Sequence, residues 1–148
     1  MGRILFDTAT TINGWIADSN NSLAWLFAVA GGDHPDDGLF PTFVFTTREL
    51  PTPEGADIRF VRGPISDHLG NIREAAGDGD IRIVGGGDLA GQFLDAGALD
   101  AIALSVAPVA FDGGAPLLPR RIESDRLRLV SVEAHGQFAR LLYDVVTR

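Results

Sequence analysis

Short runs of apolar residues recur along the chain, separated by glycine, proline and acidic residues. Their length and their content of β-branched residues are typical of buried strands. Between two of these runs, Ile65, Leu69, Ile72 and Ala76 recur at helical spacing and predict a helix with one apolar face. The predicted strands cover residues 3–9, 43–45, 58–61, 81–84 and 101–107.

The C-terminal part has a different pattern. From residue 126 onward, apolar and polar residues alternate, with one interruption at Val130, and residues 138–146 alternate in the same way. Alternation with a period of two is typical of strands with one exposed face, and His135-Gly136 between them predicts a hairpin turn. Alternating strands and helices closed by a hairpin predict an α/β fold with a mostly parallel sheet and an antiparallel edge. The 148 residues fit a single domain, 1–148.

Residues 81–97 predict a strand, a glycine turn and a helix. Gly85, Gly86 and Gly87 place three residues without side chains at the helix start, and we expect Asp88 to be the N-cap. Bare backbone N–H groups at a helix N-terminus bind anions, so a phosphate or pyrophosphate is the expected ligand. The alternative is a tight connection without a ligand, since the motif is not the G-x-G-x-x-G dinucleotide fingerprint.

Composition excludes several kinds of site. The chain has no cysteine, which rules out disulfides, thiolate zinc sites and a cysteine nucleophile. It also has no lysine, which rules out Schiff-base chemistry and the P-loop. A net charge of −8 disfavours nucleic acid as a partner. The absence of a signal-like N-terminus and of a membrane-length apolar run predicts a cytoplasmic protein without a membrane partner.

Three polar or glycine-rich stretches follow predicted strands: Thr8-Ala9, Thr46-Thr47-Arg48 and Gly85 to Asp88. In open α/β sheets, ligands bind outside the carboxyl ends of the strands. We therefore expect these stretches to converge on a nucleotide.

The order of these motifs resembles the dihydrofolate reductase superfamily, and within it the reductase domain of riboflavin biosynthesis and its stand-alone relatives. The resemblance is carried by residues 8–17, by Trp25, by Phe43-Val-Phe-Thr-Thr-Arg48 and by Val84-Gly-Gly-Gly-Asp-Leu-Ala-Gly-Gln-Phe-Leu94. Residues 104–109, 113–118 and the closing hairpin continue it in order. It implies a three-layer fold with a twisted mixed sheet flanked by helices. It also implies NADPH as cofactor, a pterin-like or aminopyrimidine substrate as for 5-amino-6-(5-phosphoribosylamino)uracil reductase, and a homodimer.

The resemblance assigns roles to individual residues. Ala9 and Ile16 would pack near the nicotinamide, and Ser105 would face the substrate. The family often has a cis peptide at the position of Gly85–Gly86. The remaining cofactor-binding residues would be Gly85, Gly86, Gly87, Asp88 and Leu89 along the pyrophosphate, and Thr46, Thr47 and Arg48 by the adenosine ribose, with Arg48 a candidate for the 2′-phosphate.

The catalytic acid is not identified by the sequence. The candidates are Asp18, Asp33 and Ser105, although a strand serine more often bonds backbone than reacts. Asp7 lies inside a predicted strand and is either a paired core carboxylate or a site residue. The three histidines are scattered, so we predict no metal site.

The chain departs from the family in two ways. Only residues 26–41 stand where relatives have a longer helix, another strand and a Gly-Arg-x-Thr turn, so the domain is apparently shortened there. Ala30 stands where dihydrofolate reductases place a carboxylate, which argues against folate as substrate. Two other hypotheses are therefore kept: a non-catalytic nucleotide-binding module, and a structural domain that dimerises through its sheet edge.

Overall fold

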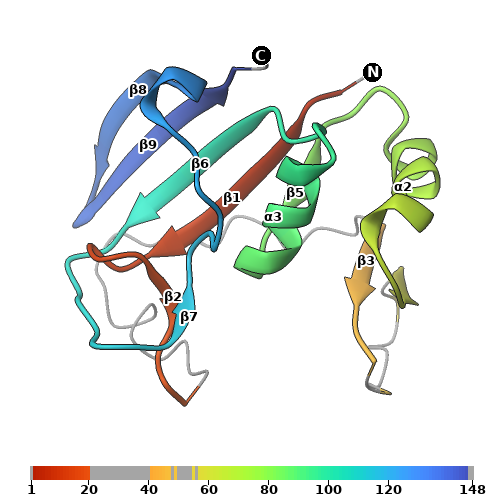
Figure 1. Ribbon diagram of the computed structural model, residues 1–148, viewed down its shortest axis with the longest axis horizontal. Coiled ribbons are helices and arrows are strands. Elements are labelled where there is room, and N and C mark those ends of the chain that lie inside the picture. The colour runs from red at the N-terminus through yellow and green to blue at the C-terminus, as the bar shows by residue number, and fades with distance from the viewer. Residues whose placement is uncertain (1, 21–40, 48, 50–54, 56, 147–148) are drawn as a thin grey trace.

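The computed structural model describes residues 2–20, 41–47, 49, 55 and 57–146. Its centre is a five-stranded sheet in the order β5-β1-β6-β9-β8, with helix α3 lying across one face (Figure 1). The strands of this sheet are β1 (Ile4–Thr10), β5 (Ile81–Ile83), β6 (Ala101–Val106), β8 (Leu127–His135) and β9 (Phe138–Val145). Within the described ranges, no helix has the length and apolar character needed to span a membrane.

Strand β1 is the middle of the core. It pairs in parallel with both β5 and β6, and Ile4 and Phe6 on it are fully buried. Helix α3 (Gly87–Asp95) covers that face with Ala90, Phe93 and Leu94. A strand with a helix packed over it leaves its alternate residues on the opposite face, which is where Asp7 and Ala9 project.

Asp100 ties three strands together at one end of the sheet. Its carboxylate accepts the N–H of Ile4 at 2.8 Å, and its own N–H donates to the carbonyl of Ile4 at 2.8 Å. Its carbonyl accepts the N–H of Val145 at 2.9 Å. The beginnings of β1 and β6 and the end of β9 therefore meet at a single residue.

The closing hairpin is confirmed. Strands β8 and β9 pair antiparallel from Leu127 opposite Val145 to His135 opposite Phe138. The register shifts between Leu129 and Ser131, which marks a β-bulge at Val130. The interruption of the alternating pattern at Val130 in the sequence has this bulge as its structural cause.

The strands predicted near residues 43–45 and 58–61 exist, but they do not join the central sheet. Strand β3 (Thr42–Phe45) pairs in parallel with β4 (Ile58–Val61) in a separate two-stranded sheet beside helix α2 (Leu69–Ala76). The single sheet implied by the sequence is therefore wrong at this edge. Strand β5 has only three residues before the glycine turn, so it presents a short edge for pairing.

The predicted helix over Ile65 to Ala76 is divided in two. A 3-10 turn, η1 (Ile65–Asp67), precedes α2, and Ile65 and Ile72 are buried as the apolar stripe predicts. A second 3-10 turn, η2 (Ser124–Arg126), leads into β8.

A small antiparallel ribbon closes the end of β1. It pairs β2 (Trp15–Ala17) with β7 (Ala115–Pro116), and neither strand is among those predicted from the sequence. Together these elements confirm the predicted α/β fold: a mixed sheet flanked by helices with a C-terminal antiparallel hairpin.

Candidate cofactor and substrate site

The glycine turn after β5 forms the N-terminus of α3 and is named here the glycine corner, Gly85 to Leu89. The peptide between Gly85 and Gly86 is cis, as the resemblance implies. Gly86, not Asp88, is the N-cap, and no side chain caps the helix. The prediction for Asp88 is wrong because the N-cap lies two residues earlier, at Gly86, and the helix begins at Gly87. This shift places Asp88 inside the first turn, where its carboxylate bonds side chains instead.

The backbone N–H groups of the glycine corner are open. Those of Gly86, Gly87 and Asp88 have no acceptor in the described part of the chain, and Gly85 and Gly86 are exposed. A Cβ built on either of these two glycines meets no atom of the described residues within 4 Å. Unsatisfied N–H groups at a helix N-terminus carry partial positive charge and are directed at whatever occupies this space. The corner can therefore hold a phosphate group.

At Gly87, by contrast, the glycine corner packs closely against another part of the chain. A Cβ on Gly87 would lie 2.5 Å from the carbonyl oxygen of Pro116 and 2.6 Å from that of Leu117. The N–H of Leu117 donates in turn to the carbonyl of Gly14 at 2.9 Å. Only glycine permits this approach, which joins the corner through β7 to the turn that follows β1.

Ala9 and Ile16, assigned to the nicotinamide, are brought to the same region. The N–H of Thr11 and the hydroxyl of Thr10 both donate to the carbonyl of Trp15, at 2.9 and 3.2 Å. These bonds fold β2 back against the end of β1. Hydrogen bonds and close backbone contacts therefore connect the end of β1, the β2–β7 ribbon and the glycine corner.

An ion cluster lies beside the corner. Arg120 bridges Asp88 at 3.2 Å and Asp95 at 2.9 Å, and its guanidinium packs against Gly91 of α3, where a Cβ would lie 2.6 Å from it. The hydrogen bonds from Gln92 and Arg120 lower the pKa of the Asp88 carboxyl. Its negative charge, which would oppose a bound anion, is thus partly compensated within the protein.

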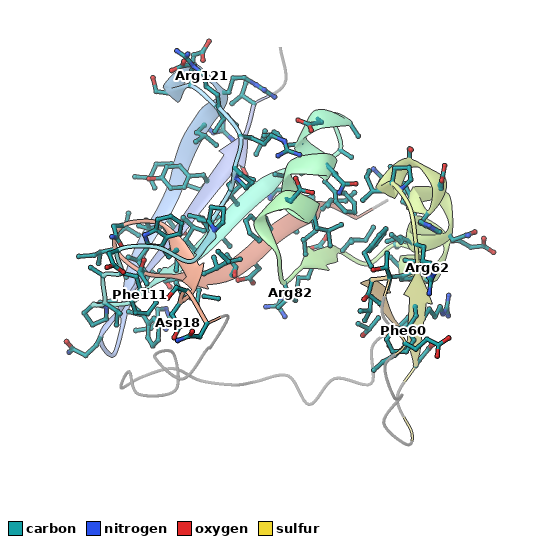
Figure 2. The ribbon with its side chains drawn as sticks, turned by 60° about the horizontal axis from the view of Figure 1, so that its bottom comes forward. Asp18, Phe60, Arg62, Arg82, Phe111 and Arg121 are labelled. Atoms are coloured by element: carbon teal, nitrogen blue, oxygen red, sulfur yellow. The ribbon has the colours of Figure 1, made fainter. Side chains whose placement is uncertain are left out.

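A second cluster lies on the face of the sheet away from α3. Asp7 on β1 accepts two hydrogen bonds from Arg140, at 2.9 and 3.1 Å, and two from Arg82, at 3.2 and 2.9 Å. Arg140 also donates to the Ser105 hydroxyl at 3.0 Å. In Figure 2, Arg82 points away from the side of β5 on which α3 packs.

Burial raises the pKa of Asp7, but the hydrogen bonds and charges of Arg140 and Arg82 outweigh it, so the net effect is a lowered pKa. Asp7 is therefore a paired carboxylate that stays ionised at neutral pH and cannot serve as a proton donor there.

The other predicted site residues are more dispersed. Thr46 and Thr47 follow β3, and Arg62 at the end of β4 donates to the carbonyl of Thr47 at 3.2 Å. Among the described strands, β3 does not pair with β5, so no such pairing brings this strand end to the glycine corner. Asp18 follows β2 and accepts the N–H of Asn20 at 2.9 Å. Arg48, Asp33 and the stretch 26–41 lie wholly or largely outside the described residues.

The structure adds residues that sequence reasoning missed. From the sequence, Arg140 was predicted only to lie in an alternating strand, and Arg82 was predicted only to lie in a buried strand. The sequence does contain a signal, namely an arginine within each of these two strands and an aspartate within a strand that lies between them in the sheet. The order of the strands must be known before this signal can be used. Among the residues the structure describes, no group of three His, Asp or Glu side chains is arranged to hold a metal ion.

The sequence matches one family model, described as the RibD C-terminal domain, over residues 33–139. The matched range is well over half of the 148 residues and includes the glycine corner and Ser105. No curated protein sequence gives a significant match.

Solved structures share the fold over nearly the whole chain. A protein from Shewanella sp. PV-4 assigned to riboflavin biosynthesis is 20% identical, with a TM-score of 0.70 over 99% of this chain and 100% of that one. The diaminohydroxyphosphoribosylaminopyrimidine deaminase/5-amino-6-(5-phosphoribosylamino)uracil reductase of Thermotoga maritima is 15% identical, with a TM-score of 0.62. This chain covers 56% of that bifunctional protein, which covers 97% of this one.

Dihydrofolate reductase from Enterococcus faecalis, solved with NADP(H), is 15% identical, with a TM-score of 0.60 over 97% of this chain and 96% of that one. At these identities the structures establish a common fold.

Proposed function

The chain belongs to the family of the RibD C-terminal domain, and from that premise we propose that it is a reductase using NADPH to reduce a small heteroaromatic substrate, pterin-like or aminopyrimidine. Reductase chemistry is supported by the family and by the reductases that share its fold. The substrate class is supported by the printed activity of the Thermotoga maritima relative. When bound, NADPH supplies the hydride, and the protein supplies position and electrostatics.

The observation that carries the proposal is the open glycine corner. The backbone N–H groups of Gly86, Gly87 and Asp88 have no acceptor among the described residues, and they suit the pyrophosphate of a dinucleotide. A chain without lysine must hold such an anion with backbone, arginine and hydroxyl groups. Ala9 and Ile16 would then shield the nicotinamide. Thr46, Thr47 and Arg48 would bind the adenosine ribose and 2′-phosphate, and Leu89 would complete the corner.

NADPH titration tests the cofactor assignment. A ligand that binds only the folded state raises the melting temperature, so NADPH should raise it in a concentration-dependent way. The variant Gly86→Val should abolish this shift, because a Cβ at this position meets no described atom within 4 Å and its side chain would occupy the space proposed for the pyrophosphate. Gly70→Ala is the control and should keep the shift, because Gly70 lies on the exposed surface of α2 and a Cβ there also meets no described atom within 4 Å. Absence of any shift at millimolar NADPH would refute the proposal.

Turnover is tested separately, by NADPH oxidation with pterins and aminopyrimidines. NADPH binding without oxidation of any of them would favour the non-catalytic nucleotide-binding alternative.

We also propose that the protein is a homodimer that pairs through β8. In the described sheet β8 has β9 as its one neighbouring strand, and it exposes Leu129, Val130 and Val132 at 52, 50 and 60%. An apolar edge strand is a site for pairing with a second chain. Light scattering should give twice the chain mass, and Val132→Lys should give a monomer. A monomeric parent protein would contradict the assignment.

A further inference from the structure

The face of the sheet opposite α3 carries a polar cluster that the cofactor does not explain. It consists of Asp7, Arg82, Ser105 and Arg140, and is named here the Asp7 cluster. Its members come from four strands, β1, β5, β6 and β9, that lie side by side in the sheet. The Asp7 side chain is only 15% exposed, whereas those of Arg82 and Arg140 are 51 and 32% exposed. The carboxylate therefore lies beneath, and the two guanidinium groups stand above it.

The hydrogen bonds leave donors unused. Arg140 donates from Nη1 to Asp7 and Ser105 and from Nη2 to Asp7, so one Nη2 hydrogen has no acceptor in the described part of the chain. Ser105 accepts from Arg140, and its own hydroxyl hydrogen likewise has no acceptor there. A guanidinium has no acceptor capacity and a serine hydroxyl has one hydrogen to give. The two side chains thus form a pair of donors fixed relative to each other.

The register places these donors next to the nicotinamide residue of the proposed function. Ser105 is the partner of Ala9 across the β1–β6 pair and of Arg140 across the β6–β9 pair. Register partners share a face of the sheet, so Ser105 and Arg140 lie on the same face as Ala9. A substrate that approaches the nicotinamide over Ala9 meets the free donors of Ser105 and Arg140.

From this geometry we propose that Ser105 and Arg140 form the substrate subsite, where both donate to one acceptor oxygen of the substrate, and that Asp7 is a positioning residue that holds Arg140. This inference rests on the proposed reductase function. The donors suit a ring carbonyl or a phosphate oxygen, and they do not suit an amino group, which is itself a donor.

The test compares three variants and two control variants with wild type in two measurements. The variants are Ser105→Ala, Arg140→Lys and Asp7→Asn, with Arg128→Lys and Ser131→Ala as controls for an ion pair and a serine elsewhere in the same sheet. The first measurement is the Kd of NADPH. The second is binding of 5-amino-6-(5-phosphoribosylamino)uracil and of its dephosphorylated form to the NADP⁺-bound protein, with KM and kcat where turnover occurs.

Ser105→Ala should weaken binding of the uracil compound or raise its KM about tenfold, as expected for one lost hydrogen bond, and should leave the NADPH Kd unchanged. Arg140→Lys and Asp7→Asn should do the same, because lysine lacks the planar fork and asparagine lacks the charge that clamps it. An effect present with both compounds assigns the acceptor to a ring carbonyl, and an effect lost with the dephosphorylated one assigns it to the phosphate.

Equal behaviour of the Asp7 cluster variants and the controls would overturn the inference while leaving the reductase intact. Failure of the NADP⁺-bound wild type to bind either compound would also overturn it. Failure of wild type to bind NADPH would instead refute the proposed function itself.

Discussion

The two faces of the central sheet are built from alternate residues of the same strands, yet they differ in chemistry. On the side of α3, Ile4, Phe6 and Ile83 are 0–4% exposed and pack against the helix. On the other side, Asp7 and Arg82 belong to an ion cluster with exposed guanidinium groups. The apolar face supplies the buried surface that stabilises the fold, and the polar face presents side chains that can bind a ligand. Substitutions on the two faces should therefore separate stability from function.

The largest expected effect is on the apolar face. Phe6→Ala removes a fully buried ring and should lower the free energy of unfolding by about 3–5 kcal/mol. Urea denaturation followed by circular dichroism measures it. A loss below about 1 kcal/mol would mean that the core does not centre on β1.

Asp7→Asn tests the polar face and should cost less, about 2 kcal/mol, because the amide oxygen still accepts from one arginine while the amide nitrogen faces the other. The same denaturation series measures it. A loss of unfolding free energy as large as that of Phe6→Ala would show that the two faces do not differ in their contribution to stability.

The pH dependence of stability sharpens the assignment of Asp7. Its pKa is lower in the folded protein than in the unfolded chain, so its contribution is fully present above the unfolded value of about 3.9 and is lost as pH falls through the folded value. The difference between wild type and Asp7→Asn should be constant near neutral pH and shrink below about pH 4. Denaturation at a series of pH values checks this, and a difference that grows on acidification would contradict it.

The smallest effect is expected for Arg128→Lys. Arg128 shares Asp144 with Arg3 on the polar face, but its side chain is 72% exposed. Exposed ion pairs contribute little, so the melting temperature should change by less than about 2 °C. Thermal unfolding measures it, and a larger change would show that exposure does not separate this pair from the Asp7 cluster.

Local patterns were sufficient to predict most of the fold. The strand–glycine–helix pattern located the glycine corner, and the interrupted alternation at Val130 marked a bulge. The capping role given to Asp88 was wrong by two residues, since three consecutive glycines leave the helix start undefined. The separate β3–β4 sheet was missed because an apolar run indicates a strand but not its neighbours.

The site was only partly predictable, because its parts are distant in sequence. Arg140 and Asp7 are 133 residues apart and meet only through the order of the strands. The resemblance supplied Ala9, Ile16 and Ser105, and the structure connects them. It does not test the roles of these residues or of Thr46 and Thr47, which stay predictions.

Asp100 gives the sheet a fixed end. The main chains of β1, β6 and β9 are locked together there, whereas the opposite ends of β1 and β6 lead into the turns and ribbon around the glycine corner. Amide hydrogens such as those of Ile4 and Val145 should consequently exchange slowly whether or not a ligand is bound, while protection gained on binding should increase along β1 toward Thr10. The sheet would then respond to its ligand by movement at the end near the glycine corner, while the end held by Asp100 stays in place.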